Sequence, residues 1–419
     1  MSAVQTAEII AVGSELLTPH RIDTNSLWLT GRLNDLGVEV RAKAIAGDEH
    51  DDLAAIVAAA VSRADLVITT GGLGPTDDDV TRDVVSRVLQ RPMHENAEVM
   101  AAIEERFKRR GLKMPEINRR QAQVPEGAVV LKNPHGTAPG LWIDHGERVV
   151  VLFPGPPREL QPMFEAEVAA RLEARSPGRR LRRRVLKVHG RSESQVEEIA
   201  YPIYSRLGDD AVPVQTTILA TPGQIELHLA AAGADVTAID RRLDDGINAL
   251  AAALGSVVFS TDGRSLEQVV GDALRARGWR IAAAESCTGG LLMGRLTDVP
   301  GSSAWTIGGV VAYDDEVKRR DLDVPAELLS AHGAVSEPVA TAMAMGIRGR
   351  FAAEIGVGIT GIAGPGGGSA AKPVGLVVIA VVTPSAQMVR TLNFPGDRSA
   401  IRQHSTAAAL DMVRRALDA

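Results

Sequence analysis

The chain has 419 residues, enough for two or three domains of ordinary size, each with its own hydrophobic core. Its single cysteine excludes an internal disulfide and a thiolate metal centre, and it suits a reducing compartment. The formal charge of -6 and the 3% content of aromatic residues argue against a nucleic-acid-binding surface made of basic and base-stacking side chains.

The first 20 residues show no basic segment before an apolar one, and no apolar run in the chain is long enough to span a membrane, so we expect a cytoplasmic protein.

The N-terminal part alternates between strands and helices. Hydrophobic spacing predicts strands at 7–13, 38–48 and 65–72 and helices at 23–37, 51–64 and 78–89. This alternation predicts an α/β fold with a mainly parallel sheet, helices on both faces, and ligands at the carboxyl ends of the strands. The segments "VGSE" and "TTGGLGPTDDD" both lie there.

An arginine-rich stretch, "RLEARSPGRRLRRR" at 171–184, has the composition of a solvated domain boundary. Beyond it, alternating strands around the helix "SESQVEEIAYPIYSRLG" predict a small α+β module, after which the αβ alternation resumes. We therefore predict three parts: residues 1–170, residues 171–258 and residues 259–419.

The glycine loop "GGLGPTDDDVTRD" is a candidate anion site. Its glycines allow a sharp turn with bare N–H groups, and the helix that follows adds its positive dipole end. Asp77, Asp78 and Asp79 would repel an anion, and a divalent cation between carboxylates and phosphate would reconcile the two. Capping of the helix N-terminus by the aspartates is the alternative.

A chain of further motifs resembles one known family. "TTGGLGPTDDDVT", "GSELL", "NPHGTAPG" and "FPGPPREL" are similar to the N-terminal domain of the CinA family (competence/damage-inducible protein A), which is similar to molybdopterin-binding domains. "AAESCTGG", "VPGSS", "VVAYDDEVK", "HGAVSEPVA", "TGIAGP", "KPVG" and "PGDR" resemble the C-terminal amidase domain of that family.

The resemblance implies three-layer αβα folds for the first and last parts and two hydrolytic activities. The first is a metal-dependent ADP-ribose pyrophosphatase in the N-terminal domain, releasing AMP and ribose 5-phosphate. The second is a C-terminal deamidase that converts nicotinamide mononucleotide to nicotinate mononucleotide and ammonia. The implied cofactors are Mg, Mn or Co, together with potassium, at the N-terminal site and none at the amidase site. The implied partners are small nucleotides and a second copy of the chain, with no nucleic acid and no membrane.

The same resemblance assigns residues to the N-terminal site. The expected metal ligands are Asp78 and Asp79, and the expected substrate-binding residues are Glu15, Asn25, Gly71, Gly72, Gly74 and Thr76. The chain departs from the family pattern at Pro19, where glycine is usual, and at Gly366, where an aspartate is common. Proline cannot take a positive φ and has no N–H to donate.

Ser286 and Cys287 compete for the role of nucleophile in "AAAESCTGGLLMG". Both are expected at a turn from a strand to a helix, where backbone N–H groups point outward. A thiol needs a neighbouring group to hold it as thiolate, no histidine is near in sequence, and a small cysteine packed behind the turn is the simpler reading. We therefore predict Ser286 as the nucleophile.

Lys318 is the candidate base, because a desolvated amine can accept the serine proton, and Tyr313 ends the preceding strand. The family resemblance implies that Ser286, Tyr313 and Lys318 are the catalytic serine, tyrosine and lysine. A solvated lysine is the alternative. The family resemblance adds Thr360 as a further active-site residue, for which a hydroxyl that merely ends a strand is the alternative. It also assigns Arg398 to a 5'-phosphate, with an ion pair to Asp397 as its alternative. The remaining expected substrate-binding residues are Thr288, Gly289, Gly290 and Gly361.

Two other functions fit the same sequence. One is a regulatory protein that binds a pterin or nucleotide without turnover. The other is a serine amidase acting on a different small amide.

Overall fold

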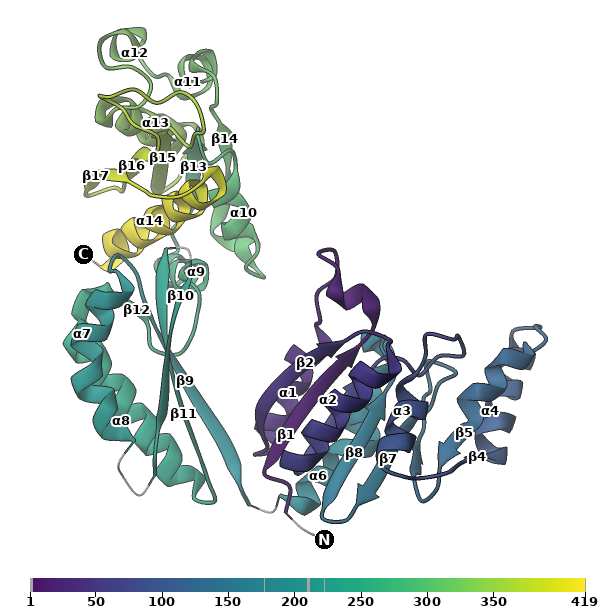
Figure 1. Cartoon of the computed structure of the whole chain (residues 1–419). Coiled ribbons are helices and arrows are strands. Elements are labelled where there is room, and N and C mark those ends of the chain that lie inside the picture. The colour runs from purple at the N-terminus through teal and green to yellow at the C-terminus, as the bar shows by residue number, and fades with distance from the viewer. Residues whose placement is uncertain (1–2, 177, 209–211, 222, 419) are drawn as a thin grey trace. The chain divides into compact units, whose positions relative to one another are not determined.

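The computed structural model describes residues 3–176, 178–208, 212–221 and 223–418, and it confirms the predicted α/β class. By its internal contacts the chain divides into two compact units (Figure 1): Met1–Arg182 with Ala231–Asp240, and Arg183–Ala230 with Arg241–Ala419. Most of residues 171–258, which we expected to form a separate module, fall in the second unit together with the C-terminal residues.

The N-terminal unit is built on a six-stranded sheet in the order β2-β1-β3-β8-β7-β6. Its strands are β1 Thr6–Val12, β2 Glu39–Ala46, β3 Leu66–Thr70, β6 Val129–Leu131, β7 Gly140–His145 and β8 Arg148–Phe153. The first four strands of that order run parallel. At one edge, β7 pairs antiparallel with β8, and β6 pairs antiparallel with β7. The parallel prediction therefore holds for the strands that precede the predicted ligand loops.

Helices cover both faces of this sheet because its buried strands present apolar side chains on alternate sides. Ile9 and its neighbours face α1 Asn25–Asp35, α5 Pro157–Met163 and α6 Ala169–Arg175. Ile10 and its neighbours face α2 His50–Arg63, α3 Thr81–Val88 and α4 Ala97–Arg109. A separate ribbon pairs β4 Met93–Glu95 with β5 Gln123–Pro125.

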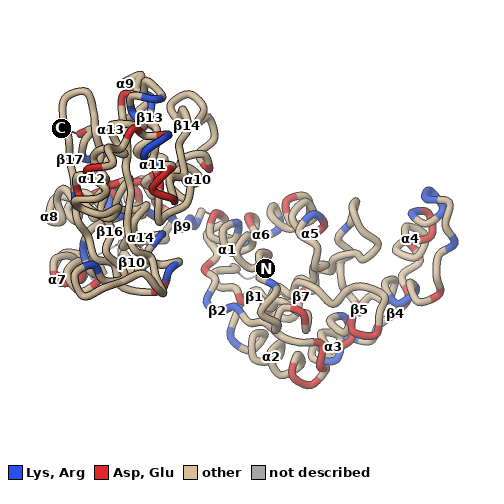
Figure 2. Tube along the Cα trace, turned by 90° about the horizontal axis from the view of Figure 1, so that it is seen from above, with Lys and Arg blue, Asp and Glu red and all other residues tan. Residues whose placement is uncertain are grey.

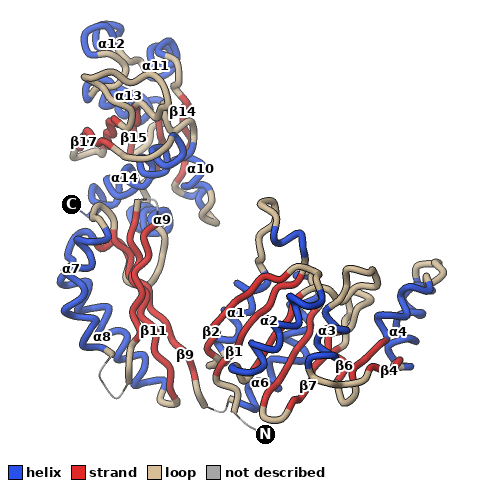
Figure 3. The backbone as a smooth tube through the Cα atoms, in the orientation of Figure 1, coloured by secondary structure: helices blue, strands red, loops and turns tan. Residues whose placement is uncertain are grey.

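A four-stranded sheet in the order β10-β11-β9-β12 follows, with β9 and β11 side by side (Figure 3). Its elements are β9 Arg180–Val188, α7 Glu193–Tyr204, β10 Gln215–Thr221, β11 Gln224–Gly233, α8 Val236–Leu254 and β12 Val258–Ser260. The arginine-rich stretch thus includes part of a strand. Arg180 pairs with Glu173 at 2.9 Å and Arg184 with Asp244 at 2.8 Å. Figure 2 shows the same mixing of charges along the rest of the trace, so this stretch is not an isolated basic patch.

The C-terminal residues form a five-stranded sheet in the order β14-β13-β15-β16-β17. Its strands are β13 Ile281–Glu285, β14 Thr306–Val311, β15 Ile355–Gly361, β16 Leu376–Val382 and β17 Gln387–Asn393. β14, β13 and β15 are parallel, and β16 and β17 are antiparallel. The predicted αβα layering of this part is observed, although the sheet is mixed.

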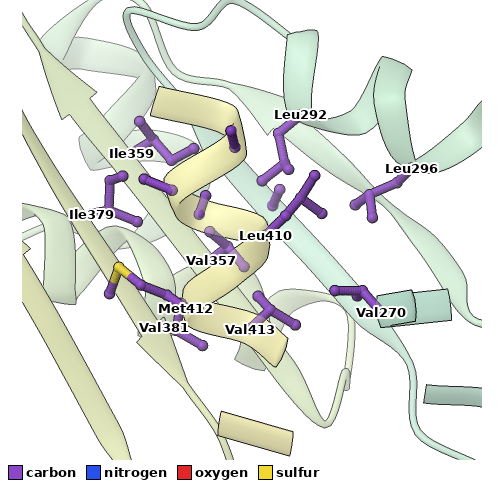
Figure 4. Packing of buried hydrophobic residues seen from close by; sticks show 14 of the residues in the cluster. Val270, Leu292, Leu296, Val357, Ile359, Ile379, Val381, Leu410, Met412 and Val413 are labelled. Carbon is purple, nitrogen blue, oxygen red and sulfur yellow. The ribbon is translucent and has the colours of Figure 1, made fainter. Parts of the chain in front are cut away.

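Three helices pack on each face of that sheet. On one face are α9 Leu266–Arg277, α10 Leu291–Thr297 and α14 Arg398–Asp418. Figure 4 shows Leu410 and Val413 of α14 among the apolar side chains of α9, α10 and the sheet. The other face carries α11 Asp315–Leu322, α12 Ala326–His332 and α13 Glu337–Arg350.

Glycine brings α13 close to the sheet. A Cβ at Gly358 in β15 would lie 2.2 Å from the carbonyl oxygen of Ala340, so only glycine fits at this distance. The close packing fixes the carboxyl end of β15, where Thr360 lies. Within the described ranges, no helix is both long and apolar enough to cross a bilayer.

Candidate functional sites

A cavity of about 650 Å³ lies at the carboxyl ends of β1 and β3 in the N-terminal unit. Most of the residues predicted for the N-terminal site line it: Glu15, Asn25, Gly71, Gly72, Gly74, Asp78 and Asp79. Thr76 is exposed and is not part of the cavity wall. The topology therefore brings the two glycine-containing segments together, as expected for the carboxyl edge of parallel strands.

The glycines of the loop are required by its backbone. Gly71 has a φ of 101°, and a Cβ there would lie 2.2 Å from the carbonyl oxygen of Val12. Gly72 has a φ of 65°, and its Cβ would lie 2.2 Å from the Thr81 hydroxyl. Side chains other than glycine would push the loop away from β1 and α3. The loop can therefore present its backbone to a ligand.

The three consecutive aspartates have three different environments. Asp77 pairs with Arg120 at 2.8 Å. Asp78 is exposed and lines the cavity. Asp79 accepts hydrogen bonds from the backbone N–H groups of Gly74, at 2.6 Å, and Thr76, at 2.9 Å, and from the Thr76 hydroxyl at 2.5 Å. Asp79 thus holds the loop together. It does not cap α3, whose N-terminus has no side-chain cap, so its role differs from both direct ligand binding and the capping alternative.

Arg82, which the sequence analysis did not single out, lies beneath the same loop. It is only 3% exposed and donates to the carbonyl oxygens of Leu73, at 2.6 Å, and Gly74, at 3.0 Å. Burial lowers the pKa of this guanidinium to about 10, so it stays charged at neutral pH. A buried cation beneath the loop favours an anion above it.

Asn25 and Glu15 differ in what they contact. Asn25 is buried and donates from Nδ2 to the carbonyl oxygen of Gly155 at 2.7 Å, which ties the start of α1 to the loop after β8. Glu15 is exposed at the cavity wall and is free to meet a ligand. Pro19 lies in an exposed turn outside the wall of the cavity, so its departure from the family pattern does not alter the wall itself.

A second cavity, of about 280 Å³, lies at the carboxyl ends of β13 and β15. It collects the four predicted catalytic residues and two of the predicted binding residues: Ser286, Tyr313, Lys318, Thr360, Gly361 and Arg398. These come from four separate stretches of sequence. Thr288, Gly289 and Gly290 are not part of its wall. Gly290, with a φ of 91°, instead provides the left-handed residue from which α10 starts.

The turn after β13 is organised by Glu285, which is 1% exposed. Its carboxylate accepts hydrogen bonds from the N–H groups of Gly290, Leu292 and Met293, so the start of α10 is already capped. Ser286 N–H donates to Ile359 O and Gly289 N–H to Ser286 O.

The remaining donors of this turn are few. Among the described residues, only the N–H groups of Cys287 and Thr288 in the "SCTGG" turn have no backbone or side-chain acceptor outside their own residue. Of these two residues, Cys287 lines the cavity and Thr288 is fully buried, so the N–H group of Cys287 is the candidate donor to an oxyanion.

Lys318 is buried, with 1% of its surface exposed, which rules out the solvated-lysine alternative. Its Nζ lies 2.9 Å from Asp315 Oδ1 and donates to the carbonyl oxygen of Tyr313 at 3.4 Å. The Tyr313 side chain is 61% exposed, and its hydroxyl accepts a hydrogen bond from Arg398 at 3.0 Å. Arg398 also donates to Gly364 O at 2.8 Å, and it makes these contacts in place of the ion pair to Asp397.

Cys287 also lines this cavity but is poorly suited to react. Burial raises the pKa of its thiol to about 12, so the thiolate is scarce at neutral pH. Thr360 is buried and donates its hydroxyl proton to Ala334 O at 2.9 Å, which leaves the hydroxyl oxygen as an acceptor. Gly366 lines the cavity with open space where a side chain would point. The wall therefore lacks the carboxylate that the family pattern commonly has there.

Three residues of these sites escaped prediction from the sequence. Asp315 precedes Lys318 by three residues on α11, and this helical spacing was an available signal. Glu285 and Arg82 gave no signal, because a buried acid that caps a helix and a buried arginine beneath a loop resemble ordinary charged residues in sequence.

Comparison with known proteins gives matches over both parts of the chain. Residues 263–417 match the family model described as "CinA C-terminal domain", and residues 8–174 match "Probable molybdopterin binding domain". A CinA-like protein of Koribacter versatilis is 46% identical over 98% of this chain and 99% of the relative. A CinA-like protein of Acidobacterium capsulatum is also 46% identical over the same shares. A solved structure, the competence/damage inducible protein CihA from Agrobacterium tumefaciens, is 40% identical and covers 37% of this chain and 94% of its own, with a TM-score of 0.36.

Proposed function

The chain belongs to the CinA family, and from that premise we propose that it is a bifunctional hydrolase. The C-terminal site would convert nicotinamide mononucleotide and water to nicotinate mononucleotide and ammonia. The N-terminal site would hydrolyse ADP-ribose to AMP and ribose 5-phosphate. The observation that carries the first activity is the single cavity that holds Ser286, Lys318, Tyr313, Thr360 and Arg398.

Ser286 is the proposed nucleophile, because it lines the cavity beside a buried amine and the neighbouring thiol stays protonated. Its Oγ would attack the carboxamide carbon while Lys318 Nζ, as the neutral amine after its proton has left, takes the hydroxyl proton. Asp315 and the carbonyl of Tyr313 position that amine in the free protein. Substrate would have to draw Lys318 away from Asp315, since no hydrogen bond joins Nζ to Ser286 among the described contacts.

The N–H group of Cys287 is the proposed oxyanion donor, since Cys287 lines the cavity and the N–H groups of Ser286, Gly289 and Gly290 are engaged. One such donor typically contributes about 3 kcal/mol to transition-state stabilisation. Collapse of the tetrahedral intermediate would break the C–N bond, and Lys318 would return its proton to the leaving ammonia. Water would then attack the acyl-enzyme and release nicotinate mononucleotide.

Arg398 is the proposed phosphate ligand of this site. Its guanidinium stands at the cavity wall, and among the described residues it donates to a carbonyl oxygen and a phenol hydroxyl, both neutral partners that a phosphate can displace. Displacement would also release Tyr313, whose side chain is exposed at the mouth of the cavity. Binding of the phosphate by Arg398 would therefore also change the position of the Tyr313 hydroxyl, one of the proposed catalytic groups.

The N-terminal residues fit a cation that is shared with the substrate. Among the described residues, no three His, Cys, Asp or Glu side chains come together as a metal-binding group. Asp78 lines the cavity and is exposed, whereas Asp79 is occupied by the loop. Magnesium commonly uses one or two carboxylates together with substrate phosphates. Asp78 is therefore the proposed ligand, and a bound divalent cation would neutralise charge on the diphosphate.

Two product assays on the purified chain test the proposal. Ammonia release from nicotinamide mononucleotide should persist in the presence of a chelator, and AMP release from ADP-ribose should stop. If neither substrate is consumed, while ADP-ribose or a pterin still binds, the chain is a binding protein. Ammonia released from other small amides alone would make it a serine amidase of different specificity.

A further inference from the structure

The second unit holds another cavity, of about 430 Å³, whose wall includes none of the residues assigned above. We name it the α14 cavity. One side is formed by residues that flank β9, α7 and β11, and the other by the end of β17 and the outer face of α14. The lining side chains used below are His189, Arg191, Arg390, Phe394, His404, Asp411 and Arg415.

The charge of the α14 cavity favours an anion. Arg191 and Arg390 are exposed in its wall, and within the described residues neither forms an ion pair. Among the described residues of the wall, Asp411 is the only acidic one, and its carboxylate is already engaged by Arg414 and by Arg415 at 2.6 Å. Two arginines are thus left without a counter-charge in a chain whose net charge is -6. The local positive charge of the cavity would attract a phosphate, although the net negative charge of the protein repels anions.

A stacked pair of aromatic rings lies in the same wall. The rings of Phe394 and His404 are stacked with their centroids 5.6 Å apart and an angle of 15° between their planes. Burial lowers the pKa of His404, so its ring is neutral at pH 7 and offers a π-face rather than a further cation. A planar heterocycle can extend such a stack by packing on the outer face of one of the two rings.

His189 adds a directional group. Its Nδ1 lies 2.5 Å from the carbonyl oxygen of Gly223, and because a carbonyl only accepts, Nδ1 carries the proton. Burial lowers the pKa of His189, which keeps the ring neutral and leaves Nε2 as an acceptor. The wall therefore combines phosphate-binding arginines, a stacking surface and an acceptor for a ligand N–H or O–H.

We propose that the α14 cavity binds a nucleoside monophosphate, with the base against Phe394 and His404 and the phosphate between Arg191 and Arg390. Its volume of about 430 Å³ lies within the range of small-molecule sites. The helix that lines it, α14, begins at Arg398, so a ligand here would contact the element that carries a residue of the amidase cavity. The proposal for binding does not depend on the proposed amidase activity.

Imidazole NMR signals test the binding directly, with AMP as the probe. The chain has nine histidines, and His189→Gln and His404→Gln variants would assign the two signals. AMP should shift both signals in a saturable manner. The Arg191→Ser/Arg390→Ser double variant should bind AMP at least tenfold more weakly. Arg241→Ser is the matched control, because Arg241 is an exposed arginine on α8 outside the cavity wall, and it should bind as the wild type does.

Two further titrations separate the two parts of the ligand. Adenosine and inorganic phosphate should each bind at least tenfold more weakly than AMP, as judged by the concentration needed to shift the two signals. The reason is that each keeps only half of the contacts. The proposal is overturned if millimolar AMP leaves both histidine signals unmoved, even when AMP binds elsewhere in the chain. It is also overturned if the double-arginine variant binds AMP as tightly as the Arg241→Ser control.

Discussion

The two cavities at the carboxyl ends of the strands are built in opposite ways. In the N-terminal cavity, one contiguous loop from Gly71 to Asp79 provides most of the predicted contacts, and its conformation is held by Asp79 and Arg82. In the proposed amidase cavity, the candidate groups come from positions between 286 and 398 and meet only after folding. A site made of one loop depends on local backbone geometry, whereas an assembled site depends on the sheet and its helices.

Each of the two sites has a buried basic side chain, Arg82 in the first and Lys318 in the second, and the two are held differently. Arg82 is 3% exposed and donates to loop carbonyls, so its charge is fixed within the protein. Lys318 is also buried, with 1% of its surface exposed, but it lines the cavity. Its Nζ pairs with the carboxylate of Asp315. The arginine fits electrostatic support of bound phosphate, and the lysine fits proton transfer.

The largest expected effect separates the two residues of the amidase turn. Ser286→Ala should lower ammonia release from nicotinamide mononucleotide by about 10³-fold or more, because the nucleophile is removed. Cys287→Ser should keep activity within about threefold, since it preserves the backbone donor. Initial rates of ammonia formation measure both. Loss of activity in the cysteine variant alone would reverse the assignment.

A second test concerns the reactivity of Cys287. With a pKa near 12, its thiolate fraction at pH 8 is about 10⁻⁴, against roughly a quarter for an ordinary cysteine. Alkylation by iodoacetamide should therefore be about a thousandfold slower than for a free cysteine. Because the pKa is raised, the rate should climb about tenfold per pH unit from pH 8 to 10. Rapid labelling that levels off near pH 9 would show an accessible, ordinary thiol.

The aspartate pair tests whether the N-terminal loop separates ligand binding from loop support. Asp78→Asn should reduce metal-dependent ADP-ribose hydrolysis by about 10²-fold with an unchanged melting temperature, since it removes an exposed carboxylate.

Asp79→Asn is the comparison variant. It should lower the melting temperature of the N-terminal unit by a few degrees, because hydrogen bonds to a carboxylate contribute about 1.5 to 3 kcal/mol each. Calorimetry and AMP release measure the two effects, and the amidase should be unaffected in both variants. If both variants change the melting temperature and AMP release in the same way, Asp78 and Asp79 do not have the separate roles of metal ligand and loop support.

The smallest of these effects belongs to Arg398. Arg398→Ala should lower kcat/KM for nicotinamide mononucleotide by roughly 10- to 100-fold, the value of one or two charge-assisted hydrogen bonds. Hydrolysis of nicotinamide riboside should hardly change, because the riboside has no phosphate to lose. Steady-state kinetics with both substrates measure the ratio. Equal losses for both would place Arg398 in the chemistry or the fold instead.

The sequence predicted the elements around both cavities because local patterns determine them. The strand at β13, the turn after it and the helix α10 follow from an apolar run, two glycines and helical spacing. The antiparallel strands at the edges of both sheets were not predicted, because pairing direction depends on distant partners. Glu285 was also missed, since a charged residue at the end of a strand reads as exposed.

The sequence by itself was enough to predict where the glycine loop and the turn at Ser286 lie and to which family the chain belongs. These features depend on residue type and spacing along the chain. Only the tertiary structure decided which carboxylate stays exposed. Asp78 and Asp79 are neighbours in sequence, yet Asp79 turns toward the N–H groups of Gly74 and Thr76. The structure likewise decided that Lys318 is buried in a cavity that also receives Arg398, 80 residues later in the chain. Burial and long-range proximity are set by packing, and packing is not encoded in any short stretch.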